Sequence, residues 1–213
     1  EQGGYGGDLD KLTNFLDRIM NWCKQNGFKK PRFVVVQTGT KVSEMQNVGL
    51  FSTPAKTLDS GIVSHLKKLV NLCERYGIYL KEHNTDYLDD GAVALRPFVG
   101  IHACNVAPEF GVVETRGLLY YLRLLGLKRQ YDRFTEISFS SGRWKKWMLC
   151  NSEATDLERS LIGGHYVFSH PEVREIRLEA SRIGAGMGID VEKMLYQLVR
   201  QVMMRYLILL NSI

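Results

Sequence analysis

The segment Arg32-Phe33-Val34-Val35-Val36-Gln37 decides the fold class of this 213-residue chain. It is a short β-branched run that stops at Thr38-Gly39. An apolar run of this length predicts a strand buried on both faces, as in a parallel sheet. Two similar runs follow at residues 77–83 and 98–103. We therefore expect three parallel strands.

Helical patterns separate these strands. Apolar residues recur at helical spacing over residues 9–23, after Asp8, which can cap a helix. A second stripe covers residues 58–73 after Thr53-Pro54, and a third runs from Pro108 to Leu125. Strands that alternate with helices predict crossover connections, and so an α/β fold with a parallel sheet. An open doubly wound sheet and an eight-stranded barrel are both compatible with this order.

Residues 128–213 contain no persuasive strand. We expect helices around residues 143–160, 172–183 and 191–210, with Pro171 at the start of the second. The glycines of Gly184-Ala-Gly-Met-Gly188 follow a helical pattern rather than a strand. We interpret them as the end of a helix rather than a nucleotide loop. The predicted domains are residues 1–127, with the strands, and residues 128–213, a helical extension.

The composition excludes several classes of protein. The hydrophobic fraction is 45%, the charged fraction 24% and the net charge +5, which are ordinary for a soluble globular protein. The basic residues are spread along the chain, so we expect no nucleic-acid partner. No apolar run is long enough to span a bilayer, so we expect no membrane association. The four cysteines are widely separated, which favours free thiols in a cytoplasmic protein over disulfides.

Polar residues follow each predicted strand, and ligands of parallel sheets bind at the carboxyl ends of strands. From pattern alone, His83 is either a metal ligand or acid/base group, or a residue that fixes a turn with Asp86. For His102, a half-buried structural role is the more common alternative. We predict catalytic roles for His83, Asp86 and His102, and a divalent metal such as Zn²⁺ or Mn²⁺ on Glu1, His83 and His102. The predicted substrate-binding residues are Gln37, Thr38, Thr85, Tyr87 and Asn105.

The segment Arg143-Trp144-Lys145-Lys146-Trp147 is the one tight basic group in the chain. It can grip a phosphate or an acidic sugar. The commoner structure for such a segment is the start of an amphipathic helix, with buried tryptophans and solvated basic groups.

The chain resembles the C-terminal half of the D-tagatose-1,6-bisphosphate aldolase accessory (non-catalytic) subunit family, GatZ/KbaZ-like. His83-Asn84-Thr85-Asp86-Tyr87 is similar to the family's His-Ser-Thr-Asp-Tyr, and residues 34–39 are similar to its Val-Val-Gln-Pro-Gly. Trp144-Lys145-Lys146 resembles a Trp-Lys-Lys element of its helical tail. Further similarities lie at Glu1 with Gly3-Gly4, at Ser160-Leu161, at Tyr166 and at Ser169-His170-Pro171.

The resemblance implies the C-terminal part of a TIM (β/α)8 barrel followed by a helical extension. Family members are longer, so it also implies a fragment that supplies only the last strands. Three features depart from the family. The third strand end, Gly100-Ile-His102-Ala-Cys-Asn105, is more polar than the family's Gly-Pro-Ala-Leu-Thr. We expect no helix between Tyr87 and the third strand, where the family has one, and the family's basic segment near His165 is largely absent.

The resemblance implies two roles in the metabolism of tagatose- or galactitol-type sugar phosphates. The first is a non-catalytic accessory subunit of a class II tagatose-bisphosphate aldolase. The second is a metal-dependent C4 epimerase of a ketose, ketose phosphate or hexuronate. The sequence leaves open whether the chain is itself an enzyme. A parallel-sheet protein with no role in sugar metabolism is a third alternative. The expected partners are a catalytic aldolase subunit or a second copy of the chain, with a sugar or sugar phosphate as ligand. A partial barrel exposes strand edges and an apolar face, so we expect self-association or poor solubility.

Overall fold

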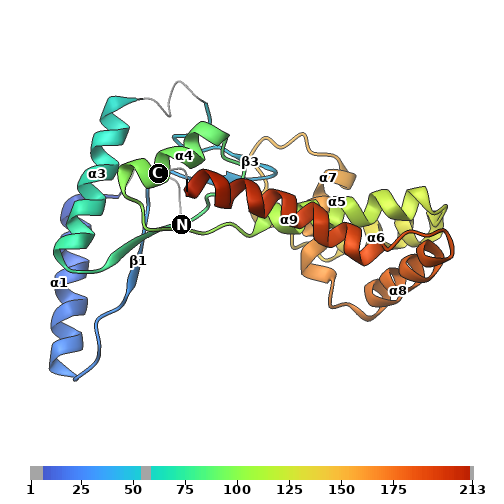
Figure 1. The fold of residues 1–213 in the computed structure, drawn as a ribbon, viewed down its shortest axis with the longest axis horizontal. Helices are drawn as coiled ribbons and strands as arrows, with labels where there is room; N and C mark the ends of the chain where they lie inside the picture. The colour runs from blue at the N-terminus through green and yellow to red at the C-terminus, as the bar shows by residue number, and fades with distance from the viewer. Residues whose placement is uncertain (1–6, 54–58, 212–213) are drawn as a thin grey trace. The chain divides into compact units, whose positions relative to one another are not determined.

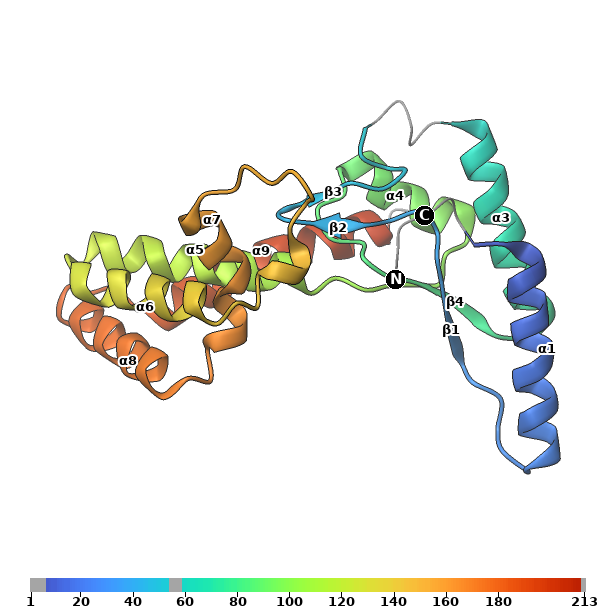
Figure 2. The ribbon, with the colours of Figure 1, turned by 180° about the vertical axis from the view of Figure 1, so that it is seen from behind.

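The computed structural model describes residues 7–53 and 59–211. The chain forms two compact units. Unit 1 comprises Glu1–Val42, Gln46–Val106 and Tyr206–Ile213, and unit 2 comprises Ser43–Met45 and Ala107–Arg205. Figures 1 and 2 show the ribbon from two opposite sides. The predicted boundary lay after Leu127, whereas the compact units divide after Val106, because the helix that follows packs against the helices of unit 2.

A small parallel sheet forms the centre of unit 1. Its strands are β1 (Phe33–Val36), β4 (Tyr79–Glu82) and β5 (Ala103–Cys104), in the order β1-β4-β5. Both pairs are parallel, with Phe33 opposite Tyr79 and Lys81 opposite Ala103. The predicted α/β class with a parallel sheet is therefore confirmed. A separate two-stranded sheet joins β2 (Val42–Ser43) and β3 (Gln46–Asn47), which the sequence did not predict.

Helices α1 (Leu9–Gln25) and α3 (Ser60–Arg75) lie side by side along the sheet of unit 1 (Figures 1 and 2). Each begins after an aspartate, Asp8 or Asp59, whose side chain accepts hydrogen bonds from two backbone N–H groups of the first turn. These caps satisfy donors that have no partner within the helix. The predicted entry at Pro54 lies outside the described residues.

Within residues 7–53 and 59–211, only one face of the sheet is covered, which corrects the prediction for residues 32–37. The side chains of Val34, Val36 and Leu80 are buried. On the opposite face, Phe33 and Tyr79 are each 44% exposed and Val35 is 51% exposed. Successive side chains of a strand point to opposite faces, so an all-apolar run cannot reveal which face is covered.

The segment between β4 and β5 corrects two further predictions. Helix α4 (Asp90–Val99) lies there, although no helix was expected. Asp89 caps its first turn, and Gly100, with φ of 87°, ends it. The apolar residues Phe98 and Val99, predicted to start a strand, belong to this helix, and β5 begins only at Ala103.

Unit 2 is helical. Helices α5 (Pro108–Leu124), α6 (Lys128–Ser140) and α8 (Pro171–Gly186) pack together, as Figure 2 shows. Shorter helices are η1 (Lys145–Trp147), α7 (Asp156–Gly163) and η2 (Gly164–Val167), and α9 (Val191–Leu210) follows. The core is apolar; its members include Leu118, Leu122, Phe134, Ile176 and Leu195.

Three of the helix predictions for unit 2 are correct and one is wrong. Helices α5, α8 and α9 lie where the patterns placed them, and the glycines around Gly188 end α8. The helix predicted over residues 143–160 is instead η1, an irregular segment and α7. Helix α6 was missed. Within the described residues, no helix has the length and apolarity needed to cross a membrane.

Candidate functional site

The carboxyl end of the parallel sheet in unit 1 contains a buried ion pair. Glu82, the last residue of β4, and Arg96 on α4 both have side chains with no exposure to solvent. Arg96 Nε lies 2.8 Å from Glu82 Oε2, and Arg96 Nη2 lies 3.1 Å from Oε1. This is a bidentate contact, the strongest arrangement of arginine and carboxylate. The Phe51 ring covers the guanidinium, whose central carbon is 4.1 Å from the ring centroid.

Residues from the other strand ends complete the contacts of this carboxylate. Thr38, beyond β1, donates to Glu82 Oε1 at 2.5 Å, and Thr85 donates to Oε2 at 3.3 Å. The thiol of Cys104, on β5, lies 3.9 Å from Oε2. Burial, and then the negative charge of Glu82, raises the pKa of the Cys104 thiol to about 12, which keeps it protonated at neutral pH.

This network ties the three strand ends together through interactions within the protein. Both oxygens of Glu82 accept hydrogen bonds from protein donors, as a buried carboxylate requires. We therefore assign Glu82 and Arg96 a structural role. The sequence contained one signal for it, because Glu82 occupies the same buried face of β4 as Leu80. A charged carboxylate on a buried face requires hydrogen-bond donors or a paired cation.

The loop after β4 carries four of the predicted site residues, His83, Thr85, Asp86 and Tyr87, and hydrogen bonds hold its backbone. Thr40 donates to the carbonyl of His83 at 2.5 Å, and Asn47 donates to the carbonyls of Asn84 and Asp86, each at 3.0 Å. The Tyr206 hydroxyl lies 3.3 Å from the carbonyl oxygen of Thr85. The loop is thus built into unit 1 rather than extended into solvent.

Two residues of this loop have left-handed backbone conformations, Asn84 with φ of 58° and Tyr87 with φ of 60°. Such conformations are costly for residues other than glycine, and they cluster at functional sites. Thr85 and Asp86 are buried between them. The loop can hold a few polar groups in fixed positions, which is the requirement for orienting the hydroxyls of a ligand.

The structure brings together some of the predicted substrate-binding residues. Thr38 and Thr85 meet at Glu82. The Asn105 backbone pairs with Thr85 N–H and with the Glu82 carbonyl, each at 3.1 Å. Gln37 lies beside them along the chain, and its carbonyl accepts from Gly7 N–H. His83 and Tyr87 are half-buried in the loop.

His102 lies elsewhere. It precedes β5, whereas His83 follows β4, so the two histidines flank the strands instead of sharing one strand end. His102 Nδ1 accepts from Leu80 N–H at 3.2 Å, Nε2 lies 3.2 Å from Glu74 Oε1, and the ring packs on Tyr79 at 4.8 Å. Both ring nitrogens therefore have partners within the protein.

The predicted metal set stays a prediction, since Glu1 lies outside the described residues. Among residues 7–53 and 59–211, no three or more histidine, cysteine, aspartate or glutamate side chains form a group suited to a metal ion. His102, with both nitrogens engaged, does not fit as a ligand in this structure. We derive no chemical step through a metal.

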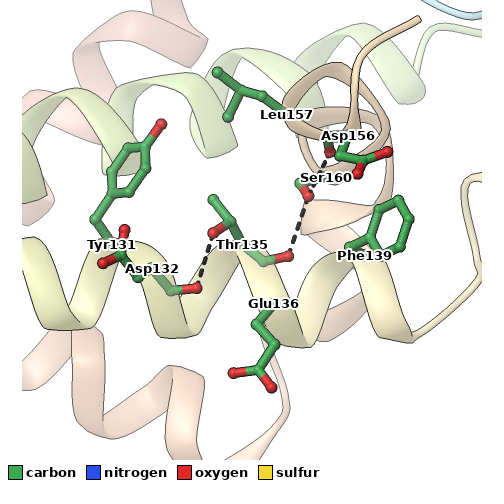
Figure 3. Close-up of a pocket in the computed structure, with 8 residues that line it drawn as sticks. All are labelled: Tyr131, Asp132, Thr135, Glu136, Phe139, Asp156, Leu157 and Ser160. Carbon is green, nitrogen blue, oxygen red and sulfur yellow. Dashed lines mark hydrogen bonds between the residues drawn. The ribbon is translucent and has the colours of Figure 1, made fainter.

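A hollow in unit 2, between α6 and α7, is drawn in Figure 3. Its acidic residues Asp132, Glu136 and Asp156 each pair with a basic side chain three or four residues away in the chain. Ser160 donates to the carbonyls of Thr135 and Asp156, as the dashed lines show. The acidic side chains and the Ser160 hydroxyl therefore have partners within unit 2, so we do not assign a site here.

Comparison with known proteins finds similarity in fold. No protein-family model matches the sequence, and no curated protein matches it. A solved structure described as a probable tagatose 6 phosphate kinase from Sinorhizobium meliloti 1021 matches with a TM-score of 0.67 and 16% identity, over 92% of this chain and 51% of that one.

A second match is the glycerol-complexed fructuronate-tagaturonate epimerase UxaE from Cohnella laeviribosi. Its TM-score is 0.60 and its identity 11%, over 93% of this chain and 42% of that one. This chain shares their fold. It spans about half the length of the first structure and less than half of the second.

Proposed function

We propose that this chain serves carbohydrate metabolism and handles an acidic sugar, either a ketose phosphate or a hexuronate. The observation that carries the proposal is the similarity in fold, over more than nine-tenths of the chain, to two proteins named for tagatose 6-phosphate and for fructuronate and tagaturonate. Fold alone does not determine chemistry. The sequence resemblance to the aldolase accessory-subunit family adds independent support for the same class of ligand.

The first form of the proposal is a non-catalytic accessory subunit of a class II tagatose-bisphosphate aldolase. The motifs at residues 34–39 and 83–87 and at Trp144-Lys145-Lys146 support it. The roles of Glu82 and His102 agree with it, because their polar groups are used in contacts within unit 1. On this proposal the three parallel strands are the last strands of an eight-stranded barrel.

The second form is a C4 epimerase, which the name of one structural neighbour favours. Inversion of a carbinol centre requires an acid/base group that can reach the sugar. His83 and Asp86 are the candidates for this task, since they lie in the loop with two left-handed residues at the carboxyl end of β4.

One experiment separates the two forms. The 213-residue chain is incubated with tagatose, tagaturonate and their phosphates, with and without Mn²⁺ or Zn²⁺, and inversion at C4 is followed by NMR. In parallel, a class II aldolase is assayed with and without the chain. Turnover by the chain alone that is lost in His83→Ala but kept in His170→Ala, an exposed histidine, supports the epimerase. Increased aldolase activity or solubility without turnover supports the accessory subunit. The absence of both effects, turnover by the chain and increased activity or solubility of the aldolase, would contradict both forms of the proposal.

A further inference from the structure

Trp144 and Trp147 of unit 2 each lie beside a lysine side chain. Trp147 belongs to a cluster of four residues, which is separate from the hydrogen-bond network around Glu82 in unit 1. We call Lys146, Trp147, His165 and Tyr166 the basic aromatic cluster. Trp147 Nε1 donates to the Tyr166 hydroxyl at 3.1 Å, which joins η1 to η2. Lys146 Nζ lies 4.9 Å from the Trp147 ring centroid and 5.1 Å from the Tyr166 ring centroid.

The positive charge of Lys146 is not neutralised within the cluster. The ammonium group contacts two aromatic faces, which attract a cation but leave its N–H donors able to bind an anion. Among the described residues, no carboxylate lies within ion-pair distance of Lys146. Lys145, the neighbouring residue, instead lies over the Trp144 ring at 5.9 Å.

His165 adds a second polar group beside the charge. Its ring packs on Tyr166 with 4.0 Å between centroids, and its Nδ1 is buried without a hydrogen-bond partner among the described residues. Such an atom is uncommon in a folded protein and calls for an explanation. Burial, and then the charge of Lys146, lowers the pKa of His165, so the ring is neutral at pH 7. A neutral imidazole can donate one hydrogen bond and accept another.

The surrounding backbone places the cluster firmly. Gly111 on α5 has no side chain where His165 packs, because a Cβ at that position would come within 2.5 Å of a ring carbon. The carbonyl of Trp147 accepts from Glu44 N–H at 2.7 Å. The Trp147 backbone and the His165 ring are therefore held by contacts with two other segments of unit 2.

We propose that the basic aromatic cluster binds an acidic sugar through its carboxylate or phosphate group. Lys146 supplies the charge for the anionic group. The aromatic rings supply an apolar surface for the sugar ring. This inference rests on the proposed function, since that function names acidic sugars as the ligand class.

The test is an NMR titration of the ¹⁵N-labelled chain, read at the indole N–H signal of Trp147, which Trp147→Phe identifies. The probes are tagaturonate, tagatose 6-phosphate, neutral tagatose and inorganic phosphate. We expect both acidic sugars to shift this signal and neutral tagatose to leave it unchanged. Lys146→Gln should weaken binding by about tenfold or more. Lys145→Gln is the matched control and should leave the affinity within about twofold of the original value.

Several outcomes would overturn the proposal. The first is no shift of the Trp147 signal at about 10 mM acidic sugar, a concentration at which weak ligands bind. The second is neutral tagatose that binds as tightly as the acidic sugars. The third is an equal loss of affinity in Lys146→Gln and Lys145→Gln. Inorganic phosphate that binds as tightly as the sugar phosphate would show an adventitious ion only. The assay is independent of turnover and of the aldolase. Binding at Trp147 without C4 inversion and without an effect on the aldolase would contradict both forms of the proposed function but support the binding site. Either activity without a shift of the Trp147 signal would support the proposed function but contradict the binding site.

Discussion

The guanidinium of Arg96 and the carboxylate of Glu82 lie together in unit 1, where neither side chain is exposed to solvent. Taking two charges out of water is expensive, and the cost is recovered only when each charge has a partner with good geometry. The bidentate contact, Thr38 and the Phe51 ring provide those partners. Removal of one partner would leave the other as a buried unpaired charge.

We predict that Arg96→Met lowers the free energy of unfolding by about 3–5 kcal/mol. Urea denaturation followed by circular dichroism measures this change. Arg133→Met is the matched control, because Arg133 also holds a carboxylate, that of Glu172, in a bidentate contact, but on the exposed surface. The control should cost much less than Arg96→Met. The double variant Glu82→Met with Arg96→Met should be more stable than the single one, and equal losses in Arg96→Met and Arg133→Met would contradict the assignment.

The lowered pKa of His165 leads to a prediction of how the free energy of unfolding depends on pH. Burial and the charge of Lys146 lower its pKa in the folded chain, so the unfolded chain binds a proton more readily. Stability therefore falls as the pH drops through the unfolded pKa, near 6.5. We expect the free energy of unfolding to decrease between about pH 7 and pH 5. His165→Gln should reduce this decrease, and an unchanged pH profile in that variant would show that His165 does not contribute.

Among the helices, the contact of η2 with α5 depends on a position that tolerates no side chain. A Cβ at Gly164 would collide with the side chain of Thr115, which is buried on α5. Overpacking of this kind forces neighbouring groups to move. Thr115 is itself fixed, since its hydroxyl donates to the Gly111 carbonyl at 2.7 Å.

Gly164→Ala should therefore destabilise the protein by about 1–3 kcal/mol. Gly186→Ala, at the end of α8, is the control, because nothing lies within 4 Å of its Cβ position. Alanine has a higher helix propensity than glycine, so this variant should raise the free energy of unfolding by up to about 1 kcal/mol. Thermal unfolding of both variants measures the effect. Two variants with the same change in midpoint would contradict the packing argument.

Local signals in the sequence predicted the helices whose ends are fixed by neighbouring residues. Asp8 caps α1, Pro108 begins α5 and Pro171 begins α8, as expected. The prediction failed where an apolar run had two possible structures. Phe98-Val99 resembles the start of a strand, but the cap at Asp89 and the left-handed Gly100 enclose both residues within α4.

The candidate site was less predictable, because its contacts join residues far apart in the sequence. Glu82 and Arg96 come from a strand and a helix, and Thr38 comes from another strand end. The predicted polar residues of the loop, Thr85 and Asp86, are buried. The position of His102 was not predictable, since its strand begins one residue after it rather than ending there.

For the whole molecule, the uncovered face of the sheet has the largest consequence. Phe33, Val35 and Tyr79 share that face, and parallel sheets are ordinarily covered on both sides. Burial of such a face against a second copy would remove apolar surface from water.

We predict concentration-dependent self-association of the chain in sedimentation velocity. Val35→Lys places a charge on the uncovered face and should shift the distribution towards the monomer. Leu178→Lys is the control, since Leu178 is 63% exposed on α8 in unit 2 and lies outside this face. A monodisperse monomer at all concentrations, or an equal effect of the two variants, would contradict the prediction.

The raised pKa of the Cys104 thiol also determines how the chain can be labelled. A maleimide dye reacts with thiolates, and a thiol with a pKa of about 12 supplies almost none at neutral pH. Cys73, with a pKa raised to about 11 by burial, is similarly protected, and Cys23 is buried. Cys150 is exposed. A single fluorophore can therefore be attached at Cys150, three residues from Trp147, without replacing any cysteine.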